Sequence, residues 1–218
     1  MSLSEDLALT IKNPEVTLRA LLDARQRIKF YTHLHEIYFK QPYYWLWSKI
    51  VEGTTIIDIG AFIGDTAIYF ALNRNVRKII AYEPHPKTFE VLKDNIDQCP
   101  IGFRKKMVLK NMAILEKEGY VNNSNKDITG TNKVKLSTSG IRATTLYKEL
   151  AGLKKVAIKA DCEGAELHMF DNADLSNVYL IQMETHGTYD HLEKILKSKG
   201  FKVSGDAGRL GYLYAERA

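Results

Sequence analysis

The chain of 218 residues lacks the features that mark membrane or secreted proteins. It contains no run of eighteen or more apolar residues, so neither a transmembrane helix nor a membrane partner is expected. Its first stretch, MSLSEDLALTIKNPE, is acidic and has no long apolar core or cleavage signal, which predicts a cytoplasmic protein. The two cysteines, Cys99 and Cys162, have no metal-ligand spacing and are expected to be reduced thiols.

The composition is that of an ordinary globular domain. Hydrophobic residues make up 45% and charged residues 26%, and no internal repeat or low-complexity tract is visible. The net charge of +5 and the pI near 9.0 suggest nucleic acid as an alternative partner. The basic residues are scattered along the chain, however, which favours a solvated basic surface over a nucleic-acid groove.

Apolar runs alternate with helical patterns from residue 54 onward. This alternation predicts a doubly wound, mostly parallel α/β sheet. The expected helices are at 65–73, 86–99 and 189–200, and extra strands are expected at 119–123, 141–146 and in 201–218. The main strands are expected in TTIIDIG (54–60), KIIAYEP (78–84), KKMVLKNMAI (105–114), KVAIKADCEG (155–164) and VYLIQMETHG (178–187).

Residues 1–53 have a different pattern. Leu18, Leu21, Leu22 and Ile28 have helical spacing, and aromatic residues crowd the segment QPYYWLW. We predict two or three helices that form an N-terminal appendage or lid, followed by a second domain at 54–218. The alternative is that these helices pack as core against the sheet.

The segment DIGAFIGD, residues 58–65, predicts a tight turn between a buried strand and a helix. Gly60 and Gly64 would let the backbone approach a ligand at the carboxyl end of the first strand. A dinucleotide site requires G-x-G-x-x-G, and here Phe62 replaces the second glycine. Asp65 would also repel a pyrophosphate. The loop therefore favours a phosphate-free ligand over the alternative, a nicotinamide-dependent oxidoreductase on a Rossmann sheet.

Glu83 ends the next strand, about twenty residues after the glycine turn. A carboxylate in this place accepts hydrogen bonds from a ribose diol. The alternative is a surface glutamate before a helix. Together with the glycine turn, Glu83 predicts a site for a nucleoside.

The chain resembles the FkbM-type family of class I S-adenosylmethionine-dependent methyltransferases. The resemblance rests on an ordered set of motifs over residues 54–187: DIGAFIGDTAIYFA, AYEPHPKTFEVLKDNI, NMAILEKEG, TTLYKEL, KADCEGAELHMFDNA and LIQMETHG. It implies a seven-stranded Rossmann-like sheet and S-adenosyl-L-methionine as cofactor. By similarity, the first motif lines the methionine end of the cofactor, Glu83 holds the ribose, and Pro84 and the NMAI segment contact the adenine. The implied cofactor residues are Asp58, Gly60, Ala61, Phe62, Ile63, Gly64, Thr66, Glu83, Pro84, Met112 and Ala113.

The resemblance places the reacting end of the site at KADCEG. Methyl transfer to a hydroxyl requires a base, for which Asp161, Glu163 and His186 are candidates, and His186 titrates nearest to neutral pH. Lys159 completes the candidate catalytic set. Alternatively, Asp161 or Glu163 caps a helix that has Glu166 in its first turn, and Lys159 forms a structural ion pair with Glu184.

No metal site is predicted, although Asp161, Glu184 and His186 offer an alternative set of ligands for a divalent cation. His168 is expected to be a surface or core residue. The fourth strand lacks a DPPY-like signature for amino groups. The resemblance therefore implies O-methylation of a small molecule or sugar, with acceptor choice set by residues 1–50 and 120–145. A nucleic-acid methyltransferase, an RNA-binding module and a methyltransferase fold without activity remain alternatives.

Overall fold

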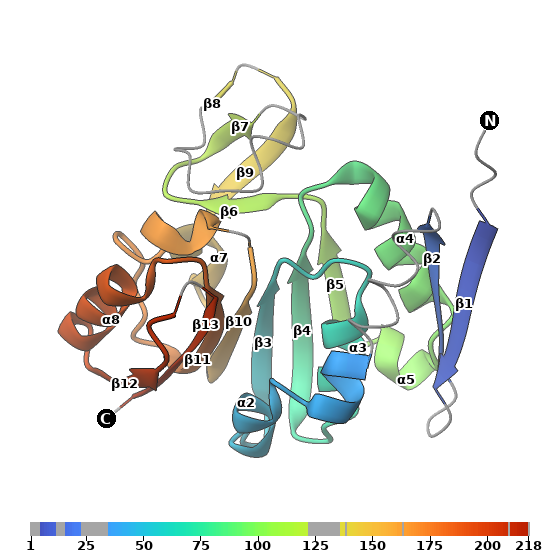
Figure 1. The fold of residues 1–218 in the computed structure, drawn as a ribbon, viewed down its shortest axis with the longest axis horizontal. Coiled ribbons are helices and arrows are strands. Elements are labelled where there is room, and N and C mark those ends of the chain that lie inside the picture. The colour runs from blue at the N-terminus through green and yellow to red at the C-terminus, as the bar shows by residue number, and fades with distance from the viewer. Residues whose placement is uncertain are drawn as a thin grey trace.

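The computed structural model describes residues 5–11, 16–22, 35–121, 136–137, 139–162, 164–208 and 210–217 (Figure 1). Its main sheet has seven strands, and every neighbouring pair is parallel except the two that β13 makes. This confirms the predicted doubly wound, Rossmann-like sheet. From edge to edge the strands are β12 (Phe201–Gly205), β13 (Gly211–Arg217), β11 (Val178–Thr185), β10 (Val156–Ala160), β3 (Thr54–Ile59), β4 (Val76–Tyr82) and β5 (Met107–Lys110).

The centre of the sheet is covered on both faces. Every residue of β3 and of β10 is buried, as expected for continuous apolar strands of a parallel sheet. From β3 the chain runs outward through α3 (Asp65–Ala71), β4, α4 (Pro86–Asp97) and α5 (Ile101–Arg104) to β5. It later returns on the other side of β3 as β10. The strand order therefore reverses between β3 and β10, and their carboxyl ends are the expected place for a ligand.

Residues 35–50 pack onto this sheet through η1 (Glu36–Lys40) and α2 (Tyr44–Ser48). The buried amide of Gln182 in β11 holds the segment: its Nε2 donates to the carbonyl of Pro42 at 2.6 Å, and its Oε1 accepts from the N–H of Leu46 at 3.1 Å. Residues 35–50 therefore pack as core helices against the sheet, and their predicted role as a lid stays a prediction. The side chains that join the buried cluster of β3 and α3 are Ile37, Tyr43, Leu46 and Ile50.

The N-terminal residues that the structure describes form strands in place of the predicted helix. β1 (Glu5–Ile11) and β2 (Val16–Leu22) pair antiparallel, and β2 lies beside α4 (Figure 1). The helix prediction is wrong for 16–22 because the apolar residues there also alternate with Thr17 and Arg19, which is the pattern of a strand. The continuation of the predicted helix over 23–34 lies outside the described residues.

A second, four-stranded sheet stands above the carboxyl ends of the main sheet (Figure 1). Its strands β7 and β9 confirm the two extra strands predicted around the polar loop. The third strand predicted at 105–114 is divided, because the chain leaves the main sheet after β5 and enters the second sheet at β6. In spatial order the strands are β6 (Ala113–Leu115), β9 (Ile141–Thr145), β7 (Gly119–Val121) and β8 (Leu136–Ser137).

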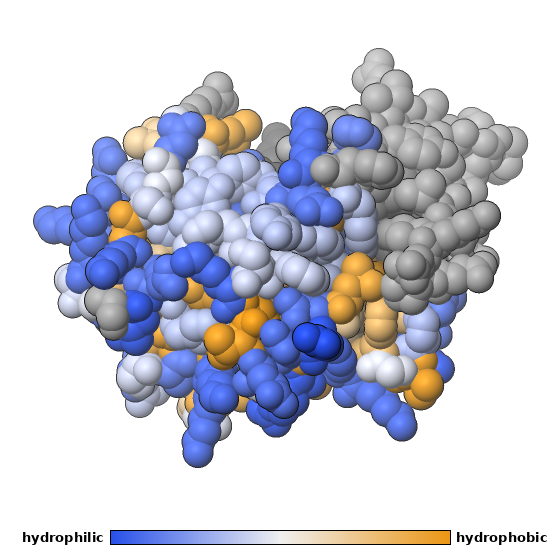
Figure 2. Space-filling model, turned by 90° about the horizontal axis from the view of Figure 1, so that it is seen from below, coloured by the Kyte–Doolittle hydropathy of each residue, from blue (hydrophilic) through white to orange (hydrophobic). Residues whose placement is uncertain are grey.

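Short helical elements complete the fold. α7 (Leu146–Leu150) leads into β10, η2 (Ala165–His168) follows it, and α8 (Tyr189–Ser198) follows β11 as predicted. Among the described residues, no helix combines the length and the apolar character needed to span a bilayer. On the face seen in Figure 2, apolar residues occur as separate spots among hydrophilic ones.

Candidate functional site

The loop after β3 is held by the neighbouring strands. The N–H groups of Gly60 and Ala61 both donate to the carbonyl of Tyr82, each at 3.0 Å. Gly60 has a φ of +75°, and a Cβ at this position would lie 1.8 Å from the carbonyl oxygen of Asp161. The glycine is therefore required because the backbone after β10 passes directly over it.

The remaining loop residues differ from the expectation of a glycine-lined ligand surface. A Cβ at Gly64 would meet Leu92 at 2.9 Å, so this glycine makes room for α4, and its contact with a cofactor stays a prediction. Phe62 has a φ of +47°, the left-handed conformation that glycine adopts at no steric cost. Ala61 and Ile63 are buried. Phe62 thus adopts a left-handed conformation at the position where the dinucleotide motif has its second glycine.

Glu83 joins this loop to the start of α4. Its Oε2 accepts from the N–H of Phe62 at 3.0 Å, and its Oε1 accepts from the N–H of His85 at 2.8 Å. Burial raises the pKa of Glu83 to about 7, although the two backbone donors lower it. The side chain of Asn111 donates to the carbonyls of Glu83 and Pro84 at 2.8 and 3.0 Å. The carboxyl group therefore sits at the carboxyl edge of the sheet, close to its ionisation point at neutral pH.

The other predicted adenine contacts lie at the same edge. Met112 is partly buried between β5 and β6, and Ala113 is buried at the start of β6. Asn111, immediately before them, braces Pro84, so these residues and the Glu83 segment share one corner of the fold. Their contact with a cofactor stays a prediction.

Asp58 and Lys159 form a buried ion pair under the loop. The Lys159 Nζ lies 3.1 Å from Asp58 Oδ1 and donates to the carbonyl of Gly60 at 2.8 Å. Asp58 Oδ2 accepts from the Thr66 hydroxyl at 2.7 Å. The predicted ion pair of Lys159 with Glu184 is wrong, because the register places Asp58 beside Lys159 on β3 and Gln182 beside it on β11.

The surroundings of Lys159 exclude it as a proton acceptor. The side chain is 2% exposed, and its ammonium lies 5.6 Å from the centre of the Tyr43 ring. Burial lowers the pKa of Lys159, but the Asp58 and Asp161 carboxylates outweigh it and hold the pKa above its ordinary value. Lys159 therefore stays charged at neutral pH and acts by holding Asp58 and the loop in place.

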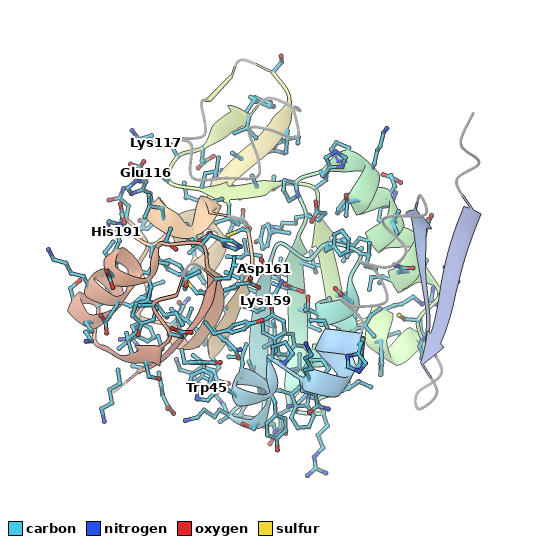
Figure 3. The ribbon with its side chains drawn as sticks, in the orientation of Figure 1. Trp45, Glu116, Lys117, Lys159, Asp161 and His191 are labelled. Carbon is cyan, nitrogen blue, oxygen red and sulfur yellow. The ribbon has the colours of Figure 1, made fainter. Side chains whose placement is uncertain are left out.

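Asp161 lies where β10 ends. It is partly buried, its N–H donates to the carbonyl of Ile59 at 3.0 Å, and Figure 3 places it near Lys159 at the centre of the sheet. Glu163, the neighbouring candidate, lies outside the described residues. Asp161 is thus the acidic residue of the KADCEG motif that the structure places beside the glycine loop.

His186 is held by Glu166, a residue that the sequence suggested only as part of a helix cap. Glu166 is fully buried, and its Oε1 accepts from the backbone N–H of His186 at 3.1 Å and from the Thr188 hydroxyl at 2.9 Å. His186 Nδ1 lies 3.3 Å from the same oxygen, and its Nε2 lies 3.9 Å from Glu184 Oε1. Carboxylates therefore lie on both nitrogen sides of the His186 ring, with Glu166 the closer of the two.

Glu166 remains ionised in this arrangement. Burial raises its pKa, but hydrogen bonds from His186 and Thr188 outweigh the burial and hold the pKa below its ordinary value. Its Oε2 also accepts from the N–H of Gly164 at 2.8 Å. One carboxylate thus ties the segment after β10 to the segment after β11. Sequence spacing carries no signal for this, because Glu166 and His186 are 20 residues apart.

Comparison with protein families identifies the same region. A model of the methyltransferase FkbM domain matches residues 58–203, which include the glycine loop, Glu83, Asp161 and His186. No curated protein matches the chain significantly.

Solved structures share the fold at low sequence identity. A methyltransferase FkbM from Methylobacillus flagellatus KT superposes with a TM-score of 0.55 at 14% identity, covering 84% of this chain and 47% of that one. A tRNA (m1A22) methyltransferase candidate from Streptococcus pneumoniae, in complex with S-adenosyl-L-methionine, gives 0.50 at 14% identity, covering 80% and 71%. A precorrin-6y C5,15-methyltransferase from Geobacter metallireducens GS-15 gives 0.49 at 15% identity, covering 79% and 85%.

Proposed function

Because the chain belongs to the methyltransferase FkbM domain family, we propose that it transfers a methyl group from S-adenosylmethionine to a hydroxyl of a small molecule or sugar. The observation that carries this proposal is the position of Glu83. The residue is 7% exposed and lies at the carboxyl edge of the sheet, and its carboxyl group accepts hydrogen bonds from the N–H groups of Phe62 and His85. It is therefore preorganised to accept hydrogen bonds from two adjacent ribose hydroxyls.

The residues of the loop fit an adenosyl ligand without phosphates. Asp58 near the end of β3 and Asp65 at the start of α3 are both acidic, and the cation beside the loop, Lys159, is already paired with Asp58. These carboxylates would repel a pyrophosphate. S-adenosylmethionine carries no phosphate and has a positively charged sulfur, so they would not repel it. Asp58 and Thr66 would contribute by fixing the loop, and Pro84, Met112 and Ala113 would border the adenine.

When bound, S-adenosylmethionine supplies a methyl group activated by a positively charged sulfur. The task of the chain is to orient the acceptor hydroxyl and to take up its proton. His186 suits this role, because it follows β11 at the carboxyl edge of the sheet and the buried carboxylate of Glu166, 3.3 Å from its Nδ1, orients the imidazole. Glu166 would stabilise the resulting imidazolium, since it is buried and ionised.

The acceptor would enter from the side of the second sheet. That sheet stands above the carboxyl ends of the main sheet (Figure 1), and its strand β6 contacts η2, the element that carries Glu166. The segment predicted to set acceptor choice, 120–145, overlaps β7, β8 and β9 of this sheet. We therefore assign acceptor selection to β6–β9.

Calorimetry with S-adenosylhomocysteine tests the cofactor. Wild-type protein should bind it, Glu83→Ala should weaken binding by about tenfold or more, and Glu90→Ala, at an exposed glutamate on α4, should bind like wild type. No binding by the wild type, or tighter binding of NADH in a parallel titration, would overturn the proposed cofactor.

A turnover assay tests the base and the acceptor class. The assay follows S-adenosylhomocysteine formation with a panel of sugars and hydroxylated small molecules. His186→Gln should keep cofactor binding and lose roughly 100-fold in kcat, the usual range for a lost general base. A variant that keeps full turnover would remove His186 from the mechanism, and turnover only with amines would contradict O-methylation.

A further inference from the structure

Three potential metal ligands meet on the outside of the fold, away from the glycine loop. His168 ends η2, Asp171 follows three residues later, and His191 lies in the first turn of α8 (Figure 3). His168 Nδ1 lies 2.9 Å from Asp171 Oδ2, and His191 Nε2 lies 3.5 Å from Asp171 Oδ1. One ligand atom from each residue falls within 4.8 Å of the others. These residues were not expected to carry a function.

Two of these atoms lack a hydrogen-bond partner. Asp171 Oδ1 and His191 Nε2 are both buried, and neither makes a hydrogen bond to any described residue; their contact with each other is the 3.5 Å separation given above. A buried polar atom that makes no hydrogen bond is costly, and an ion bound by both atoms would satisfy each of them. The three side chains remain 30% to 42% exposed as a whole, so an ion can reach them from solvent.

We propose that His168, Asp171 and His191 bind a divalent transition-metal ion, with Zn²⁺ the best fit. Tetrahedral Zn²⁺ with nitrogen and oxygen ligands places these atoms about 3.4 Å apart, close to the 3.5 Å between His191 and Asp171. Two imidazoles and one carboxylate suit zinc, whereas Mg²⁺ and Ca²⁺ prefer oxygen ligands alone. The fourth position is left to water.

The ion would join two elements that also build the site of His186. Glu166 lies in η2, and Thr188 precedes α8 directly, so both residues that position His186 stand on the elements that the ion connects. The proposed role is therefore structural: the ion fixes η2 against α8. The site is independent of the proposed methyl transfer and is tested without it.

Metal titration of the full chain tests the proposal. Protein freed of metal by a chelator and dialysis is titrated with ZnCl₂ in a calorimeter and heated with and without the ion. The wild type should bind one Zn²⁺ per chain, and its thermal midpoint should rise by about 5 °C at saturating zinc. Co²⁺ in place of zinc should give the visible d–d absorption of a tetrahedral site.

Single-ligand variants separate this site from adventitious binding. Zinc binding should weaken at least about tenfold in each of the variants His168→Gln, Asp171→Asn and His191→Gln. Because all three side chains are partly exposed, a loss of binding in all three variants would not be explained by misfolding. His35→Gln, at an exposed histidine elsewhere, should bind like wild type. The proposal is overturned by a wild type that binds no zinc, or by variants that bind as tightly as the wild type.

Discussion

Glu83 should make the binding of S-adenosylhomocysteine depend on pH. The ionised carboxylate accepts charge-assisted hydrogen bonds from the ribose, whereas the protonated form offers weaker acceptors. With a pKa of about 7 in the free protein, roughly one tenth of the carboxyl groups are ionised at pH 6 and nine tenths at pH 8. The Kd should therefore fall about tenfold between these two pH values.

Calorimetric titrations at half-unit steps from pH 5.5 to 8.5 measure this change. Glu83→Gln is the control, because it keeps one acceptor oxygen but does not titrate. Its Kd should be weaker at pH 8 and nearly constant with pH. Asp58 and Lys159 are the charged groups that act on Glu83, and both remain in the variant. A wild-type Kd that is flat with pH, or an equal slope in Glu83→Gln, would refute the assignment of the ribose to Glu83.

The same carboxyl group should affect the stability of the free protein. Its folded pKa of about 7 lies above the ordinary 4.5, so folding favours the protonated form. The contribution is fully present below about pH 4.5 and is lost as the pH rises through 7. A shift of this size is worth about 3 kcal/mol. Urea unfolding of the wild type relative to Glu83→Gln should show a difference that declines by that order between pH 4.5 and 8.

Three further outcomes are expected. Gly60→Ala should lower the free energy of unfolding by about 3 kcal/mol or more, because the new Cβ would meet the Asp161 backbone. Gly152 has the same φ of +75° but open space around it, so Gly152→Ala should cost only roughly 1 kcal/mol. Equal losses of the two variants in urea unfolding would contradict the clash. Glu166→Gln should move the pH–kcat limb of His186 about one unit lower, since the carboxylate no longer stabilises the imidazolium, and an unmoved limb would exclude that role. Lys159→Met should leave Asp58 as an unpaired buried charge and cost about 3–5 kcal/mol in thermal or urea unfolding; a neutral effect would show that the ion pair does not hold the loop.

The parallel sheet was predictable because its central strands are apolar on both faces. The sequences of β3 and β10 lack the polar–apolar alternation that would indicate a strand with one exposed face. Clear helix patterns, such as that of α8, follow the strands. The hairpin β1–β2 was not predictable, since seven residues with apolar positions at 16, 18, 20, 21 and 22 fit a strand and a helix equally well. Pairing with β1 decides between the two.

The strand ends that carry the candidate residues could be predicted from the sequence, but the ion-pair and hydrogen-bond partners of these residues could not. Strand ends gather at one edge of a parallel sheet, so Glu83, Asp161 and His186 were correctly expected there. The partner of Lys159 depends on strand order and register, which place Asp58 beside it. Likewise, Gly60 was expected to face a ligand, because sequence does not reveal that the backbone after β10 crosses above it.

The two hydrogen bonds that the Gln182 side chain makes with Pro42 and Leu46 have a consequence for the order of folding during synthesis. The amide is separated from its two partners by 140 and 136 residues. At about 5–20 residues per second, a ribosome needs roughly 7 to 28 seconds to make that stretch. During this time the apolar side of α2 has no docking site on β11. The aromatic segment around α2 therefore stays exposed until β11 has been synthesised. During this period, chaperone binding or aggregation would compete with folding.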